Sequence, residues 1–276
     1  MDNLIWTNIG ILGGVAFVAA VVLYFVSRRF YVEPDVTAEK ITKVLPQANC
    51  GGCGYAGCAD FASACSRSDA EGFAKLYCPV GGATVMKKVS KIKGFAAVEK
   101  KPSVAVLRCQ GNCANAPEKT AYDAVSSCRI ANQISVGKSG CPQGCLHLGD
   151  CVKVCKFGAL SFDEETQMPI VDRKKCTACG ACVKACPRGL FEIRELSTKG
   201  SLLYVACRNT QKGAVARKNC LAACIGCQKC AKLNPDIKVE NNLSYIPQNV
   251  DAEEWGKQLT EACPTKAIVY KEKTYA

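Results

Sequence analysis

Hydrophobic residues form one unbroken run near the start of the chain and are otherwise scattered in short stretches. Residues 4–26 are 23 positions without a charged side chain, which is enough for an α-helix to span a bilayer with some tilt. We therefore predict a transmembrane anchor over residues 1–30. A cleaved signal peptide is the alternative, but the run lacks a basic start and is longer than the apolar part of most signal peptides.

The charges that flank the run predict its orientation. Only Asp2 precedes it, whereas Arg28 and Arg29 follow it. By the positive-inside rule, the N-terminus faces outward and the rest of the chain lies in the cytoplasm. We therefore expect a prokaryotic inner-membrane protein with a single N-terminal anchor and a cytoplasmic body.

Beyond the anchor, the hydrophobic pattern predicts only short elements. Residues 36–48 favour a short helix with Thr37 as its N-cap, and residues 59–70 favour a second helix that carries Cys65. Two β-type stretches flank a polar turn within residues 159–172, which predicts a hairpin. Aromatic residues make up only 7% of the chain, so the cores should be small. We expect small α+β modules whose metal sites supply much of the folding energy.

The 22 cysteines decide what kind of metal site to expect. They occur in runs with gaps of two or three residues, and such close neighbours rarely reach disulfide geometry but surround an iron–sulfur cluster well. The chain has one histidine, His147, whereas zinc sites often combine His with Cys. A cytoplasmic location also keeps thiols reduced. These observations favour [4Fe–4S] clusters.

The first group of cysteines lies in a glycine-rich loop. Glycines between the cysteines allow the backbone to bend tightly round a cluster. We predict a four-Cys cluster domain over residues 31–95, and its ligands would be Cys50, Cys53, Cys58 and Cys78. Cys65 lies on the predicted helix and is interpreted as a small buried thiol instead of a ligand.

The central run has the spacing of bacterial ferredoxins, in which the fourth cysteine of each run serves the other cluster of a pair. The companion run upstream has Leu148 where a cysteine is expected, and Cys141 is the nearest replacement. We predict a double-cluster ferredoxin domain over residues 141–196. One cluster would take Cys155, Cys176, Cys179 and Cys182, and the other Cys141, Cys145, Cys151 and Cys186.

A second copy of this arrangement follows. Residues 219–235 align with residues 140–156, so that Cys220 matches Cys141 and Cys224 matches Cys145. One complete ligand set of the pair is missing from this copy, while the other is retained. We predict a degenerate ferredoxin-like domain over residues 197–276, and its one cluster would be held by Cys224, Cys227, Cys230 and Cys263.

The remaining cysteines leave two interpretations open. Residues 96–140 form a Cys-containing connecting segment, and a fifth cluster drawing on this segment is one interpretation. Reduced structural thiols, or a thiol that contacts a partner's metal, are the other. The candidates for the fifth cluster are Cys109, Cys113 and Cys128, completed by Cys207 or Cys220. Four clusters are therefore expected, or five if this set binds iron.

The formal charge of +12 counts every cysteine as neutral. An oxidised cluster with four thiolates carries about −2, so four clusters lower the sum to about +4. The lysines, for example Lys87, Lys88, Lys91 and Lys93, are then either solvated surface or a docking face for an acidic partner. No aromatic-rich basic motif indicates nucleic-acid binding.

These features together resemble a known family. The anchor, the glycine-rich motif of Cys50–Cys58 and the ferredoxin run from Cys176 are similar to those of the B subunits of the Rnf complex, an ion-translocating ferredoxin:NAD⁺ oxidoreductase. The extra cysteines and second module resemble its longer form from anaerobes. The resemblance implies that the chain accepts electrons from soluble reduced ferredoxin and relays them through [4Fe–4S] clusters. Other membrane subunits would bind flavin and NAD and move Na⁺ or H⁺.

Three other functional classes are alternatives. An electron-transfer subunit of a hydrogenase or formate dehydrogenase would carry intact paired runs without the first domain. Corrinoid iron–sulfur proteins share a similar four-Cys domain, but the anchor argues against that class. A non-redox binding module held by zinc is the remaining alternative. No phosphate-binding glycine loop and no acid–base pair is present at a convincing spacing, so we expect no catalytic side chain.

Overall fold

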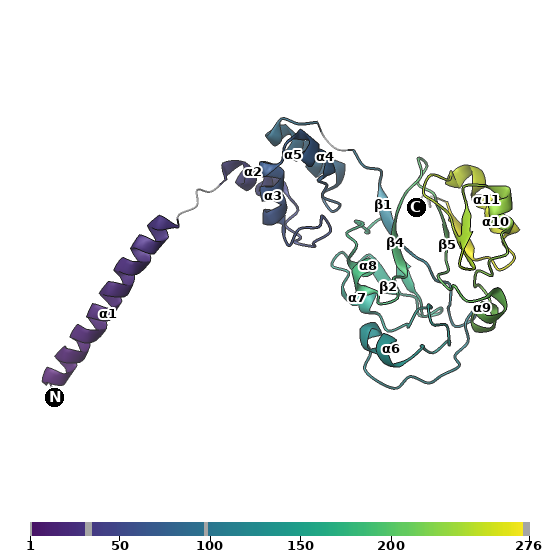
Figure 1. The fold of residues 1–276 in the computed structure, drawn as a ribbon, viewed down its shortest axis with the longest axis horizontal. Coiled ribbons are helices and arrows are strands. Elements are labelled where there is room, and N and C mark those ends of the chain that lie inside the picture. Colours follow the sequence, from purple (N-terminus) through teal and green to yellow (C-terminus); the bar gives the residue numbers. More distant parts are fainter. Residues whose placement is uncertain (1, 31–34, 97–98, 273–276) are drawn as a thin grey trace.

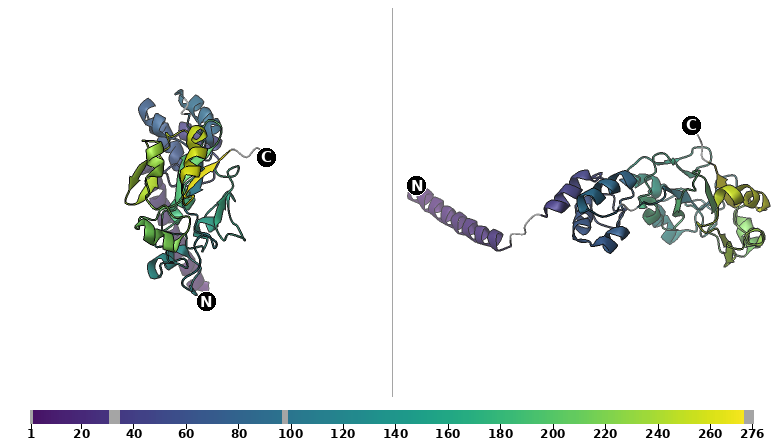
Figure 2. Two further views of the ribbon diagram at one scale, coloured as in Figure 1. Left: turned by 90° about the vertical axis from the view of Figure 1, so that its right-hand side faces the viewer. Right: turned by 90° about the horizontal axis from the view of Figure 1, so that it is seen from above.

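The computed structural model describes residues 2–30, 35–96 and 99–272. A long N-terminal helix is followed by a small helical domain and then by two modules of short helices and two-stranded antiparallel sheets (Figure 1, Figure 2). The predicted mixed α and β architecture is confirmed. Because each element is short, contacts between segments distant in sequence must hold the modules together.

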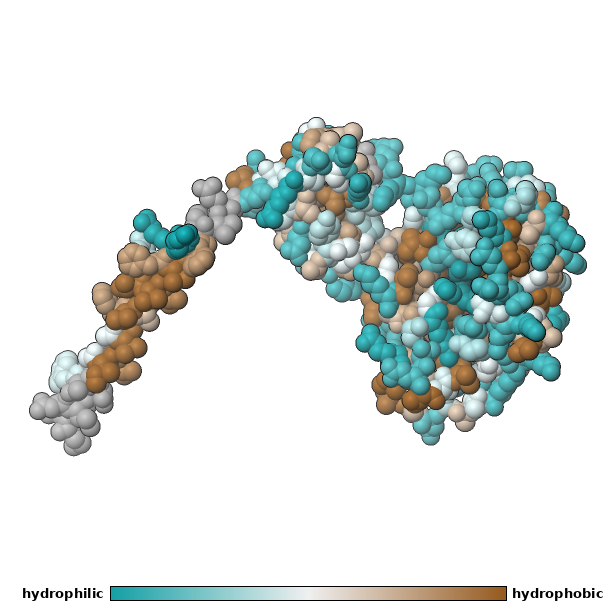
Figure 3. Space-filling view, in the orientation of Figure 1, coloured by the Kyte–Doolittle hydropathy of each residue, from teal (hydrophilic) through white to brown (hydrophobic). Residues whose placement is uncertain are grey.

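The N-terminal helix α1 runs from Asp2 to Arg29. Its stretch Gly10–Arg29 is long and apolar enough to cross a membrane, and it is not buried by the rest of the chain. Figure 3 shows this stretch as a nearly continuous apolar surface that ends at the two arginines. The helix expected over residues 4–26 is therefore present.

Four helices make up the next domain: α2 (Val36–Val44), α3 (Cys58–Arg67), α4 (Ala70–Lys75) and α5 (Gly82–Lys93). Their apolar faces bury Ile41, Phe61, Phe73 and Met86. Cys65 is fully buried in the same core, as the sequence predicts. The loop of residues 50–57 lies between α2 and α3 and contains no regular structure.

The N-cap of α2 was predicted incorrectly. Asp35, instead of Thr37, precedes the first helical residue, and its Oδ1 accepts hydrogen bonds from the backbone of Thr37 and Ala38 at 2.9 and 3.1 Å. A carboxylate satisfies two free amides of the first turn and also interacts favourably with the positive end of the helix dipole. A hydrogen bond from Ser66 is the largest cause of a lowered pKa at Asp35, and the two amide bonds lower this pKa further.

The two modules have the same order of elements. The first contains α7 (Asp150–Lys153), β2 (Leu160–Phe162), β3 (Pro169–Val171), α8 (Ala181–Ala185) and β4 (Phe191–Glu195). The second contains α10 (Lys229–Leu233), β6 (Lys238–Glu240), β7 (Leu243–Tyr245), α11 (Ala252–Ala262) and β8 (Ile268–Lys271). The hairpin predicted within residues 159–172 is confirmed, because β2 pairs antiparallel with β3. The internal repeat read from the cysteines is thus a repeat of structure.

The repeat extends further toward the N-terminus than the cysteine runs. A strand preceding each module pairs antiparallel with that module's last strand: β1 (Ser103–Leu107) with β4, and β5 (Leu202–Val205) with β8. A short helix then precedes each cysteine run: α6 (Cys128–Ile134) in the first copy and α9 (Gly213–Asn219) in the second. The connecting segment of residues 96–140 therefore supplies a strand and a helix to the first module.

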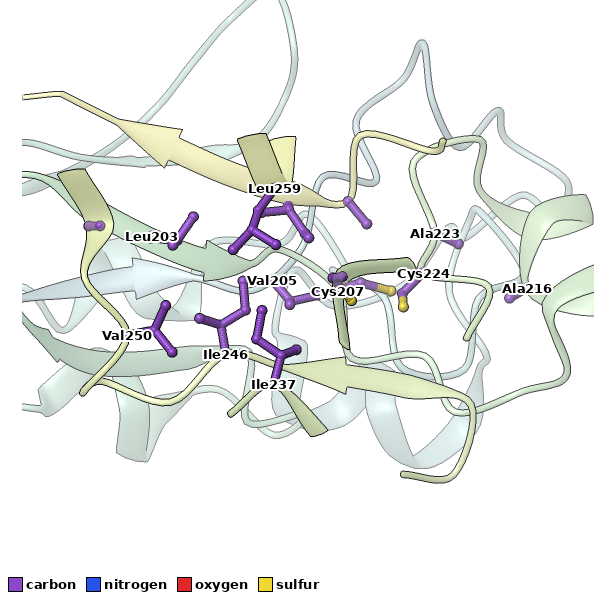
Figure 4. Close-up of a cluster of buried hydrophobic side chains, with 14 residues drawn as sticks. Leu203, Val205, Cys207, Ala216, Ala223, Cys224, Ile237, Ile246, Val250 and Leu259 are labelled. Carbon is purple, nitrogen blue, oxygen red and sulfur yellow. The ribbon is translucent and has the colours of Figure 1, made fainter. Parts of the chain in front are cut away.

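The two modules pack against each other through β1 and β5. Val104 and Val106 of β1 share a buried cluster with Leu202 and Tyr204 of β5. A buried ionic network lies beside this contact, where the Glu192 carboxylate is 3.3 Å from both Arg108 and Arg194. The second module also has its own core, shown in Figure 4, in which Cys207 and Cys224 lie among aliphatic side chains.

Candidate metal centres

The four cysteines predicted for the N-terminal domain lie together. Burial raises the pKa of the Cys78 thiol, and the neighbouring Cys53, Cys50 and Cys58 raise it further. Backbone amides point at two of the sulfurs: Gly52 donates to Cys50 Sγ at 3.5 Å and Gly81 donates to Cys78 Sγ at 3.4 Å. Such N–H···S contacts stabilise a thiolate and tune a bound cluster.

The set Cys155, Cys176, Cys179 and Cys182 also converges. All four line one small cavity beneath β2 and β3. Burial raises the pKa of Cys182 to about 12, with Cys176 and Cys179 contributing as like charges. The backbone amide of Ala105 in β1 donates to Cys176 Sγ at 3.4 Å. The strand from the connecting segment therefore helps to form this site.

The set in the second module, Cys224, Cys227, Cys230 and Cys263, lines another small cavity. Burial raises the pKa of Cys224, and Cys230 and Cys263 add to the rise. The Cys230 sulfur lies 3.2 Å from the Ser244 hydroxyl. Cys227 is exposed, unlike the buried Cys224 and Cys230, so this site opens to the surface at one corner.

The second set of the first module differs from the sequence pattern. Cys145, Cys151 and Cys186 are accompanied by Cys128 in place of Cys141. Burial raises the pKa of Cys151 to about 12, and its thiol neighbours are Cys128 and Cys186. Burial also raises the pKa of Cys145, whose thiol neighbours are Cys109, Cys151 and Cys128.

One side chain explains why Cys128 reaches this position. Asp150, the first residue of α7, accepts hydrogen bonds at Oδ2 from the Ser127 hydroxyl at 3.0 Å and from the Arg129 backbone at 3.1 Å. These contacts hold the start of α6 against α7, which carries Cys151. Cys128, the first residue of α6, is thereby held near Cys151.

Cys141 lines a neighbouring cavity with Cys109, Cys207 and Cys220, and Cys145 borders this cavity as well. Among the sequence candidates for a fifth cluster, Cys109, Cys207 and Cys220 are therefore together, and Cys128 belongs with the neighbouring set. Cys113 joins neither: it is exposed, and its thiol donates to the Glu165 carbonyl at 3.4 Å. The internal repeat could have predicted that Cys141 and Cys220 lie together, because the two residues align and occupy equivalent places in their copies.

The thiol groups are spread around cavities. Among the described residues, no three side chains of His, Cys, Asp or Glu converge closely enough to hold one metal ion. The cysteines instead surround small cavities, and amides at the second residue after Cys50, Cys109, Cys145 and Cys207 point back at the sulfurs at 3.4–3.5 Å. This donor set of thiolates with backbone N–H groups fits an iron–sulfur cluster.

Comparison with family models supports this interpretation. Residues 45–71 match a model described as "Putative Fe-S cluster", and residues 140–190 match a model described as "4Fe-4S dicluster domain". The first match contains the glycine-rich loop, and the second contains both cysteine runs of the first module. Iron–sulfur clusters are therefore the cofactors of this chain.

Three curated relatives extend over nearly the whole chain. The B subunit of the ion-translocating oxidoreductase complex of Methanosarcina acetivorans is 36% identical over 97% of this chain and 99% of its own length. The B subunit of the Na⁺-translocating ferredoxin:NAD⁺ oxidoreductase complex of Acetobacterium woodii is 37% identical over 97% of this chain and 78% of its own length.

The third relative is the B subunit of the proton-translocating ferredoxin:NAD⁺ oxidoreductase complex of Clostridium ljungdahlii. It is 38% identical over 97% of this chain and 91% of its own length. The family expected from the cysteine motifs is confirmed by these matches. The chain belongs to the family of B subunits of the Rnf-type ion-translocating ferredoxin:NAD⁺ oxidoreductases.

Proposed function

We propose that this chain is the electron-transfer subunit of a membrane-bound, ion-translocating ferredoxin:NAD⁺ oxidoreductase. It accepts electrons from soluble reduced ferredoxin and relays them through [4Fe–4S] clusters to the membrane subunits. The observation that carries this proposal is that cysteine sets adjoin one another, with the N-terminal set against the first module and the two sets of that module sharing one core. No acid, base or nucleophile is required for such a relay.

The ligand sets follow from the thiol groups described above. Three of them agree with the sequence pattern: Cys50, Cys53, Cys58 and Cys78; Cys155, Cys176, Cys179 and Cys182; and Cys224, Cys227, Cys230 and Cys263. In the fourth, we assign Cys128 in place of Cys141, so that its ligands are Cys128, Cys145, Cys151 and Cys186. Each cluster, when bound, takes up and releases one electron with little change in geometry.

The protein contributes the spacing and the environment of these sites. Contacts between neighbouring sets join them in series. Gly52 of the N-terminal loop lies against the backbone of Cys179, and the two sets of the first module share the core that contains Cys151 and Cys182. Burial limits the access of water to several of the sulfurs, for example Cys78, Cys151 and Cys182, and the amide donors stabilise the added negative charge.

The anchor determines where the relay operates. Helix α1 fits a membrane location, and Arg28 and Arg29 lie at its C-terminal end. The positive-inside rule supports a cytoplasmic position for the cluster domains. In that compartment the thiols stay reduced and soluble ferredoxin is accessible.

The exposed Cys227 supports electron entry at the second module. Residues 208–238, which surround it in sequence, contain seven Lys and Arg residues and one acidic residue, Asp236. Lys212 precedes α9, and a Cβ atom on the adjacent Gly213 would be 2.7 Å from the Ile225 carbonyl oxygen. This contact places Lys212 beside the loop that holds Cys227. A basic surface at an exposed cluster steers an acidic partner.

The α5 lysines fit this role less well. Lys87 is paired with Glu99 at 3.3 Å, and Lys93 donates to the Ser66 carbonyl at 2.6 Å. Cys78, the nearest ligand in sequence, is buried and precedes the helix, whereas the lysines lie from the middle of the helix to its end. We therefore place the docking face for ferredoxin around Cys227 instead of on α5.

The test is the rate at which reduced acidic ferredoxin reduces the purified full-length protein. The Lys229→Glu/Lys232→Glu variant should lose at least tenfold in second-order rate at low salt, and the difference should shrink at high salt. The matched Lys40→Glu/Lys43→Glu variant on α2 should react like the wild type. A larger loss in Lys88→Glu/Lys91→Glu would move the docking face to α5, and cluster reduction by dithionite but not by any ferredoxin would contradict the relay.

A further inference from the structure

Two cysteines occupy equivalent places after the first strand of each module. Cys109 follows the end of β1 by two residues, and Cys207 follows the end of β5 by two residues. The Cys109 sulfur accepts a hydrogen bond from the Gly111 amide at 3.4 Å, and the Cys207 sulfur accepts one from the Asn209 amide at 3.4 Å. The two loops thus present their sulfurs in the same local geometry.

The equivalence extends to the modules that follow. The backbone amide of Cys145 also donates to the Cys109 sulfur, and that of Cys224 donates to the Cys207 sulfur. Cys145 and Cys224 are themselves matched in the repeat. Each thiol is therefore held by its own turn and by the first ligand of its own module.

A second pair shows the same relationship. Cys141 and Cys220 each stand four residues before the first ligand of their module, Cys145 and Cys224. Each also follows a short helix, α6 or α9. The buried Asn209 amide group donates to the Cys141 sulfur at 3.4 Å, which joins a residue of the second copy to a thiol of the first.

The four thiols meet where the copies join. They line one cavity, which Cys145 of the neighbouring set also borders, and burial raises the pKa values of Cys109, Cys207 and Cys220 to about 11. Each of these three thiols has a neighbour from the other copy: Cys220 lies near Cys109 and Cys141, and Cys207 lies near Cys109. Cys141 and Cys207 are buried, and Cys109 and Cys220 are partly buried. Four thiols gathered around one cavity have no evident structural use, since they fill space no better than aliphatic side chains.

We propose that Cys109, Cys141, Cys207 and Cys220 hold a further [4Fe–4S] cluster at the junction of the two copies, with two ligands from each copy. This site rests on the relay function proposed above and extends it. The match to the dicluster model covers residues 140–190 and therefore includes only one of its four ligands, Cys141.

The position of the junction site completes the relay. Cys109 lies next to Cys145 of the set in the first module, through the amide contact described above. Cys207 lies next to Cys224 of the set in the second module, and Figure 4 labels both in the same part of the core. The junction cluster therefore bridges the modules, and electrons entering near Cys227 reach the first module through it.

The experiment compares single and double alanine variants of the full-length protein after anaerobic cluster reconstitution. Iron, acid-labile sulfide and zinc are counted, and low-temperature EPR resolves the reduced clusters. Cys207→Ala and Cys141→Ala should each lose about four iron atoms per chain, and the double variant should lose no more than either one. Cys128→Ala combined with Cys207→Ala should lose about eight. Cys113→Ala, the matched control at an exposed thiol, should lose none.

Several results would overturn the junction cluster. They are an unchanged iron content in Cys207→Ala, the loss of zinc instead of iron, or additive losses in Cys141→Ala/Cys207→Ala. If an alanine variant fails to fold, Cys207→Ser and Cys220→Ser replace it, and both should alter the same EPR signal. Alteration of two different signals contradicts the proposal. A wild-type protein that folds without any iron would instead contradict the relay function itself.

Discussion

A Cβ atom on Gly52 would lie 2.8 Å from the carbonyl oxygen of Cys179. The loop of the N-terminal domain and the ligand loop of the first module therefore meet backbone to backbone at this point. The Lys184 ammonium group adds a contact of 3.5 Å to the Gly51 carbonyl. The absence of a side chain at position 52 sets the closest approach of two proposed clusters.

Substitution of Gly52 should slow electron transfer between the domains without removing a cluster. Valine at this position forces the two loops apart, because the atoms it meets include backbone that cannot rotate away. The rate at which the N-terminal cluster is reduced after rapid reduction of the others should fall, more in Gly52→Val than in Gly52→Ala. Rapid-freeze EPR measures this rate. The exposed Ala56→Val in the same loop is the control, and an equal rate in Gly52→Val would show that the contact does not limit transfer.

Loss of the Glu192 carboxylate should destabilise the paired modules. Glu192 neutralises Arg108 and Arg194, whose side chains are only 9% and 4% exposed. Removing it leaves two buried cations without a counter-charge, which costs about 3–5 kcal/mol. Thermal unfolding of anaerobic Glu192→Ala should show this loss. The control is Glu195→Ala, at an exposed position on the same strand, which should unfold at the wild-type temperature. If Glu192→Ala also unfolded at that temperature, the ionic network would not contribute to stability.

Arg188 should raise the reduction potential of the clusters beside it. Its guanidinium group donates to the carbonyl oxygens of Cys141 and Gly144 at 3.0 and 2.7 Å. Burial lowers the pKa of Arg188, while Cys141, Cys145 and Cys186 oppose that shift. A positive charge favours the reduced, more negative cluster, so Arg188→Gln should lower the potential by roughly 40 mV, equivalent to about 1 kcal/mol for one electron. Redox titration by EPR measures the shift, and Arg188→Lys should recover most of it.

Removal of iron should unfold both modules but leave α1 helical. Their sheets have two strands and most of their helices are short, and such elements are not stable alone. Thiols also occupy the cores, for example Cys207, Cys224 and Cys230 in the cluster of Figure 4. Oxidation and chelation in detergent should therefore abolish most β-type circular dichroism. EDTA alone is the control, and native spectra after complete iron loss would show that the cores fold without clusters.

Local spacing allows much of this arrangement to be predicted from the sequence. Cys176, Cys179 and Cys182 lie within one loop and the turn that follows, so their convergence requires no knowledge of distant segments. The hairpin and the helix around Cys65 follow from patterns of the same short range. The wrong N-cap shows the limit of such reasoning: Thr37 and Asp35 both suit a cap, and the carboxylate forms the bonds.

Long-range assignments cannot be obtained in this way. Cys128 reaches Cys151 because Asp150 binds the residues on both sides of it, and no spacing rule encodes that contact. Proximity in sequence favours Cys141 as the substitute for the missing ligand at Leu148. In the structure, Cys141 instead lies with Cys220, its equivalent in the repeat. Strand β1 falls within a connecting segment by sequence alone, because its partner β4 lies more than eighty residues away.

The buried contacts of Arg194 have a consequence for any attempt to dissect the chain. From the first module, its guanidinium group donates to the carbonyl oxygens of Leu203 and Ile246 in the second. A chain truncated after residue 196 would leave that cation facing solvent and would strip Cys109 of its neighbours Cys207 and Cys220. The two copies thus constitute a single cooperative unit despite their repeated sequence, and neither is suited to excision as an independent ferredoxin.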